Sequence, residues 1–135
     1  MIIAVCTDDN NGMLFNNRRQ SRDMLLIEDL IKYANANKIL INEFSKSLFS
    51  DYENNILISD TFLTDAEKND ICFVENVDLT NFKDKINTLI IYRWNRVYPA
   101  DFCFNLDLSN YKLIETKDFK GNSHEKITRE IYSLW

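Results

Sequence analysis

The feature that most constrains the fold is an uninterrupted apolar run near the N-terminus. Ile2 to Cys6 is rich in β-branched residues and shows no alternation of polar and apolar side chains. This pattern is typical of a strand that is covered on both faces in a mainly parallel sheet. Further short apolar runs predict strands at residues 38–41, 55–59, 71–74 and 88–93. Because parallel strands require crossover connections, this succession predicts an α/β fold.

Helical segments are predicted between these strands. Residues 22–35 repeat apolar side chains at helical spacing, and Ser21 is expected to cap this helix at its N-terminus. Shorter helical pieces are predicted at 43–49 and 80–86. Residues 7–20 are rich in Asp and Asn, which predicts a long loop after the first strand. A loop of this length usually lies over a site or is mobile.

The C-terminal part changes to an antiparallel pattern. Residues 111–119 and 126–134 are expected to form two strands joined by a turn at Gly121-Asn122-Ser123. With 135 residues, of which 45% are hydrophobic, the chain can bury one sizeable core, so a single domain over residues 1–135 is expected. The predicted fold class is therefore α/β, with a mixed, mostly parallel central sheet flanked by helices and a C-terminal antiparallel β-hairpin.

Charge and composition argue against several classes of function. The formal net charge is −5, so no general positive field exists to hold a nucleic acid. No apolar segment approaches the roughly 18 residues that span a bilayer, so no membrane association is expected. Cys6, Cys72 and Cys103 are odd in number and set among apolar residues, which predicts reduced, packed thiols and a cytoplasmic location. His124 has no partner at ligand spacing, so no metal is expected.

Short motifs accompany these predicted elements in a particular order. Asn11-Gly12-Met13 follows the first strand, Ser21-Arg22-Asp23-Met24 opens the first helix, Ala100 to Phe104 follow the strand at 88–93, and Asn122-Ser123-His124 precedes the last strand. In this order the sequence resembles the dihydrofolate reductase family over nearly the whole chain. The motifs are similar to the family's mobile active-site loop, its Pro-x-Asp-Leu segment, its Gly-Asp-x-x-Phe segment and its final turn.

The resemblance implies a shortened dihydrofolate-reductase-like fold. The shortening falls between Ser59 and Ile71, where the family has a strand and a helix that line the adenosine of its cofactor. The family holds the phosphates of NADPH with a Gly-Arg-x-Thr turn and a Gly-Gly pair, because glycine lets backbone N–H groups approach a pyrophosphate. Here Glu43 and Glu75 stand in these turns, and carboxylates repel phosphate.

Other positions also lack the residues that the family uses to bind its substrate and to support catalysis. The arginine that pairs with the folate carboxylate in the family falls at Glu53 or Asn54, and Tyr92 replaces the threonine that supports the catalytic carboxylate. Asp23 alone remains at its expected place, as the implied catalytic residue. No cofactor is therefore expected, and NADPH only if a reductase activity survives.

The segment from Gly12 to Asp23 carries the candidate site. Gly12 is expected to be the hinge of the loop. Basic side chains around a helix start suit a phosphate or carboxylate, which predicts a weak anion-binding site. The anion-binding candidates are Arg18, Arg19, Ser21 and Arg22. Two alternatives stay open: the arginines form a solvated loop patch, and Asp23 serves only to compensate the helix dipole.

Three functions are compatible with the sequence. The favoured one is a non-catalytic binding or regulatory protein for an unidentified small ligand or protein partner. The second is an NADPH-dependent reductase of dihydrofolate or a related pteridine or nucleotide-like substrate, with Asp23 as proton donor. The third is a homo-oligomeric structural protein, a homodimer through the sheet edge that the shortening between Ser59 and Ile71 uncovers.

Overall fold

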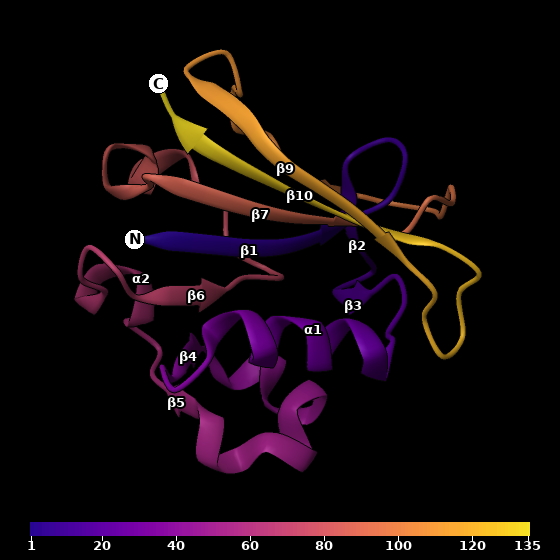
Figure 1. Ribbon diagram of the computed structural model, residues 1–135, viewed down its shortest axis with the longest axis horizontal. Coiled ribbons are helices and arrows are strands. Elements are labelled where there is room, and N and C mark those ends of the chain that lie inside the picture. Colours follow the sequence, from indigo (N-terminus) through magenta and orange to yellow (C-terminus); the bar gives the residue numbers. More distant parts are fainter.

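The N-terminal apolar run forms the central strand of a seven-stranded sheet in the computed structural model, which describes residues 1–135. Strand β1 (Ile2–Thr7) pairs in parallel with β6 (Ile71–Phe73) on one side and with β7 (Thr88–Arg93) on the other. The strand order is β5-β4-β6-β1-β7-β10-β9 (Figure 1). The remaining strands are β4 (Ile39–Ile41), β5 (Ile56–Ile58), β9 (Tyr111–Phe119) and β10 (Ile127–Leu134).

The two halves of this sheet differ in strand direction. β4 pairs in parallel with both β5 and β6, whereas β10 runs antiparallel to β7 and to β9. The mixed, mostly parallel sheet and its C-terminal hairpin are therefore confirmed. β5 stands at one end of the strand order and is therefore an edge strand.

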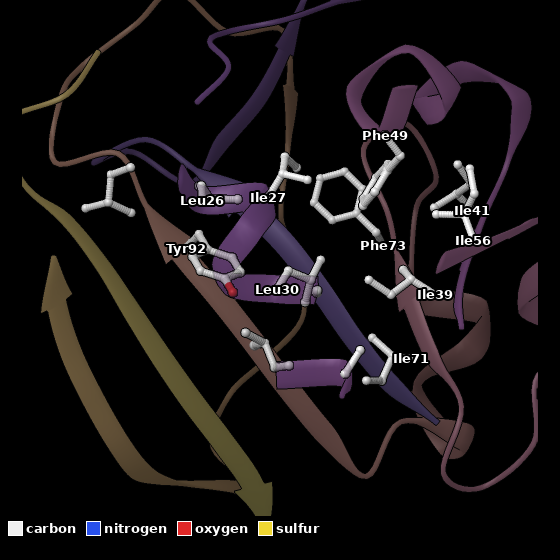
Figure 2. Packing of buried hydrophobic residues seen from close by; sticks show 14 of the residues in the cluster. Leu26, Ile27, Leu30, Ile39, Ile41, Phe49, Ile56, Ile71, Phe73 and Tyr92 are labelled. Carbon is white, nitrogen blue, oxygen red and sulfur yellow. The ribbon is translucent and has the colours of Figure 1, made fainter. Parts of the chain in front are cut away.

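Both faces of β1 are buried, as its continuous apolar run requires. Ala4 lies in the core on the face covered by helix α1 (Met24–Ala34), while Ile3 and Val5 lie in a second core on the opposite face. Figure 2 shows the first core, where the α1 side chains pack beside Phe49 and Phe73. The second core is covered by α2 (Phe62–Asp65), the 3₁₀ helix η2 (Thr80–Lys85) and residues of a smaller sheet.

Helix α1 begins at Met24, and Asp23 rather than Ser21 is its N-cap. The Asp23 carboxylate accepts a hydrogen bond from the Leu25 N–H at 3.0 Å. The expected capping role of Ser21 is therefore wrong, because the chain is still extended there and the helix starts three residues later. The last turn ends at Asn35, whose φ of 57° lies in the left-handed region.

The predicted long loop at residues 7–20 is instead part of a second sheet. Strands β2 (Gly12–Phe15) and β3 (Arg18–Arg19) form a hairpin, and β2 also pairs with β8 (Phe102–Cys103). Asn16 and Asn17 both have positive φ, the geometry of a tight two-residue turn, which asparagine tolerates better than most residues. Alternation along β8 leaves Cys103 exposed, so the prediction of a packed thiol is wrong at that position.

Two helical segments also differ from expectation. The predicted helix at 43–49 is the first part of a longer 3₁₀ segment, η1 (Glu43–Asn55), with non-helical geometry at Phe49 and Tyr52. The polar stretch before β6 contains α2, which was not expected. No helix has the length and apolar character needed to cross a membrane.

Candidate functional site

Asp23 lies where the start of α1 meets the turn before β10. Besides Leu25, the backbone N–H groups of Asn122 and Ser123 each donate to its carboxylate at 3.0 Å. His124 Nδ1 lies 2.8 Å from Asp23 Oδ2. Asp23 is buried, with an exposed fraction of 3%. A carboxylate has about four lone-pair positions, so these partners leave none for a substrate.

The protonation state of Asp23 follows from these contacts. Burial opposes ionisation, but the hydrogen bonds from His124 and from the three backbone N–H groups outweigh it and lower the pKa of Asp23. The side chain is therefore an ionised acceptor at neutral pH. A proton donor for reduction needs the opposite property, a carboxyl that holds its proton near the working pH.

His124 is a buried partner of Asp23 that sequence reasoning missed. Its Nε2 lies 2.9 Å from Ser21 Oγ, and its ring stacks on Trp94 with centroids 4.6 Å apart. The residue is only 5% exposed. The signal in the sequence was the Asn122-Ser123-His124 motif, but its pairing with Asp23 spans about a hundred residues and no local pattern encodes it.

Arg19 makes a two-pronged ion pair with Glu75. Its Nε lies 2.8 Å from Oε1 and its Nη2 lies 3.0 Å from Oε2, while the Ser45 hydroxyl donates to the same carboxylate at 2.7 Å. The guanidinium also donates to the Phe44 carbonyl and lies 5.2 Å from the centre of that ring. The contact joins β3, the start of η1 and the turn that follows β6.

The four anion-binding candidates therefore do not form one cluster of free groups. Arg19 is paired with Glu75 and Ser21 with His124, whereas Arg18 and Arg22 are exposed and make no ion pair. The N–H groups of Met24 and Leu25 at the helix start are taken by Asn122 and Asp23. The free cations left near this helix are Arg18 and Arg22.

Gly12 is buried at the start of β2. Its N–H donates to Asp8 Oδ1 at 2.7 Å, and an added Cβ would lie 2.6 Å from the Ala100 Cβ. Asp8 also accepts from the N–H of Tyr98 at 2.9 Å and from the Gln20 side chain. Glycine is therefore needed here because the Gln20 and Ala100 side chains leave no room for a Cβ.

The space between β3, α1 and β6 is nearly filled. The cavity there has a volume of about 20 Å³ and is lined by residues that include Arg19, Ser21, Asp23, Glu75 and Trp94. This is close to the room that one water molecule needs, and a bicyclic ring would not enter without displacement of side chains. The Tyr92 hydroxyl donates to Asp29 at 2.7 Å and does not support Asp23.

A larger hollow lies at the β5 edge of the sheet. Its volume is about 800 Å³, and its lining residues are Glu43, Phe44, Lys46, Ser47, Ser50, Glu53 and Ile56 to Ile58. Leu57 is 51% exposed and Ile58 40% exposed. The hollow therefore combines apolar side chains with charges of both signs beside an edge strand.

Comparison with known proteins identifies the fold. No family model matches the chain, and no curated protein matches it. Among solved structures, dihydrofolate reductase from Enterococcus faecalis in complex with NADP(H) and RAB-propyl has a TM-score of 0.70, with 10% identity, over 99% of this chain and 96% of that one. At this identity the similarity shows the fold alone. The expectation of a dihydrofolate-reductase-like fold is confirmed.

Proposed function

We propose that this chain is a binding or regulatory protein that keeps a dihydrofolate-reductase-like fold without the reductase reaction. The observation that carries the proposal is the Arg19–Glu75 ion pair, with Ser45 bonded to the same carboxylate. Glu75 stands in the turn that the resemblance assigns to the family's phosphate-binding glycine pair. In this chain that turn carries a negative charge, and its polar partners are already bound.

The energetic cost of opening this contact supports the proposal. Glu75 is buried and Arg19 is largely covered, with side-chain exposures of 9% and 22%. Separation of a buried ion pair leaves uncompensated charge and costs about 3–5 kcal/mol. A nicotinamide cofactor would have to supply that energy while it brings phosphates toward the Glu75 carboxylate.

The substrate side of the site supports the same interpretation. Asp23 is ionised and fully hydrogen-bonded, and the adjoining cavity of about 20 Å³ has no room for a pteridine ring. The hollow at the β5 edge offers a partner far more space. The bound partner, a small ligand or another protein, is expected at that hollow.

A second candidate function is a homo-oligomeric protein. The observation that favours it is the free edge of β5, with Leu57 and Ile58 exposed beside the hollow. Unpaired edge strands with apolar side chains commonly pair with another chain. The two functions are compatible, since a dimer interface and a ligand can occupy different parts of one surface.

The reductase reaction provides the direct test. Purified protein is incubated with NADPH and dihydrofolate, and the loss of NADPH absorbance is followed beside a thermal-shift titration with NADPH. We expect no turnover and no rise in melting temperature. Turnover that disappears in a folded Asp23→Asn variant would overturn the proposal. Stabilisation by NADPH, which mass action requires of any native-state ligand, would contradict the loss of the cofactor site.

A further inference from the structure

Ser21, His124 and Asp23 form a hydrogen-bonded chain in a fixed order. Ser21 Oγ lies 2.9 Å from His124 Nε2, and the other ring nitrogen, Nδ1, lies 2.8 Å from Asp23 Oδ2. Serine hydrolases use the same order of hydroxyl, imidazole and carboxylate on unrelated folds. We propose that Ser21 is an activated nucleophile and that this group is an acyl-transfer site for small activated esters that carry a negative charge.

The hydrogen bonds determine the tautomer of His124. Asp23 is ionised and can only accept, so Nδ1 must carry the proton that it donates to Oδ2. In the neutral ring, Nε2 then carries a lone pair, and the Ser21 hydroxyl at 2.9 Å is nearer to it than the Tyr98 hydroxyl at 3.4 Å. Ser21 is therefore the donor to Nε2, which is the arrangement that a general base requires before it removes a serine proton.

The ring and the carboxylate are held in place by their surroundings. His124 stacks on Trp94 with an interplanar angle of 27°, and Asp23 is fixed by the backbone N–H groups of Asn122 and Ser123. Gly121 packs so closely against Asp23 that an added Cβ would lie 2.8 Å from its Cγ. The base and its carboxylate are thus buried and pre-oriented, whereas Ser21 is half-exposed and can meet a substrate.

The neighbourhood of Ser21 limits the substrate. The adjoining cavity of about 20 Å³ admits only a very small acyl group, so we assign the acetyl class. Arg22, also in the cavity lining, is exposed and makes no ion pair, which suits a carboxylate or phosphate on the leaving group. The backbone N–H of Arg22 has no hydrogen-bond acceptor in the protein. It is available to stabilise the oxyanion.

The reaction needs no other reagent than the ester and water. Ser21 Oγ attacks the carbonyl carbon and passes its proton to His124 Nε2, while the carbonyl oxygen takes up the negative charge. When this intermediate collapses, the bond to the leaving oxygen breaks and the imidazolium returns its proton to that oxygen. An acetyl group then remains on Ser21, and water removes it as acetate by the same two proton transfers.

Acetylation of the intact protein provides the first test. The protein is treated with O-acetylsalicylate, an anionic acetyl ester, and with the neutral ester 4-nitrophenyl acetate, and the site is mapped by mass spectrometry of proteolytic peptides. We expect one acetyl group on Ser21 from each reagent. The Cys103→Ser background removes the exposed thiol, which would otherwise react by itself.

Variants separate an activated serine from a passive one. A fluorophosphonate probe should label Ser21 and fail to label Ser21→Ala, and His124→Gln should slow labelling by at least ~100-fold, the usual contribution of a general base. Ser109→Ala, in an exposed turn, should label like the parent protein. Because His124 is the single histidine in the chain, ester hydrolysis in Ser21→Ala would have to come from the imidazole acting alone.

The substrate class has its own test. Arg22→Ala should slow acetylation by the anionic O-acetylsalicylate more than it slows acetylation by the neutral 4-nitrophenyl acetate. The proposal is overturned if peptide mapping of the unmodified sequence finds no acetyl or phosphonyl group on Ser21, or if His124→Gln labels as fast as the parent. Both results are independent of NADPH oxidation, so they are distinguishable from failure of the proposed binding function.

Discussion

Single side chains decide what this fold can still do. Glu75 and Asp23 are both carboxylates at the rim of the same small cavity, yet their partners give them different roles. Glu75 binds the Arg19 guanidinium and the Ser45 hydroxyl, and it thereby connects the turn after β6 with β3 and η1. Asp23 is held by backbone N–H groups and by His124, which leaves it as a fixed negative charge beside an imidazole.

The Arg19–Glu75 pair should be visible as a contribution to stability. Glu75→Gln removes the charge but keeps the shape, and it leaves the partly buried guanidinium without its counter-ion. We expect the free energy of unfolding in urea to fall by about 3–5 kcal/mol. The matched control is Glu43→Gln, because Glu43 is 69% exposed and lies 3.8 Å from Lys46. It should change stability by less than about 0.5 kcal/mol, and equal effects of the two would contradict the role of Glu75 in connecting these segments.

Acid should destabilise the protein through three buried or half-buried carboxylates. Burial opposes ionisation of Asp8, Asp23 and Asp29, but hydrogen bonds outweigh it and lower the pKa of each. A carboxyl with a lowered pKa in the folded state stabilises that state above the unfolded pKa of about 4, and this contribution is lost as pH falls further. The urea midpoint should therefore drop between pH 4 and pH 3. A midpoint that stays constant over this range would contradict the prediction.

At the scale of elements, the sequence predicted the strands that have a clear hydrophobic pattern. It did not predict the elements that depend on turn geometry or on distant contacts. The strands at 88–93 and 111–119 begin and end as expected, because each has a clear change of polarity at its ends. The hairpin of β2 and β3 was missed, since its strands are short and its turn depends on positive φ at Asn16 and Asn17. The continuation of η1 beyond residue 49 was also missed, because its apolar residues show no helical periodicity.

The end of helix α1 offers a test of backbone strain. Asn35 has φ of 57° and ψ of −118°, a combination that only glycine adopts without cost. Asn35→Gly should raise the free energy of unfolding by about 1 kcal/mol. It relieves strain of about 1–3 kcal/mol, and the greater freedom of glycine in the unfolded chain offsets part of that gain. Asn37→Gly, two residues later and without positive φ, should not stabilise. A loss of stability in Asn35→Gly would refute the assignment of strain.

At the scale of the molecule, the fold was predictable and the site only in part. The order of apolar runs and motifs was enough to indicate the dihydrofolate-reductase-like fold, which the structural comparison confirms. Asp23 was expected to be a catalytic carboxylate or to compensate the dipole of the first helix, and in the structure it caps α1. Its partners His124 and Asn122 come from the far end of the chain. Long-range side-chain contacts follow from the packing of the whole fold, so no window of sequence contains them.

The two outer edges of the sheet differ in how they resist association. β9 is long, but it carries charges of both signs and has a bulge at Ile114, opposite Ile131 and Tyr132 of β10. Both features discourage edge-to-edge pairing. β5 has neither device within Ile56–Ile58, and its Leu57 is 51% exposed. Its peptide groups on the outer side have no strand partner, because β4 occupies only the inner side. β5 is therefore the edge at which a second copy is expected.

We expect the protein to sediment as a dimer at micromolar concentration and Leu57→Lys to sediment as a monomer. The new charge would be placed at the centre of the three-residue strand, where two copies related by a two-fold axis would bring like charges together. Ile114→Lys is the matched control, since Ile114 is 58% exposed on the opposite edge strand β9, and it should leave the dimer intact. A parent protein that is monomeric would remove the homo-oligomeric candidate. A dimer that Ile114→Lys alone dissociates would place the interface at β9, and the hollow beside β5 would then be left to another partner.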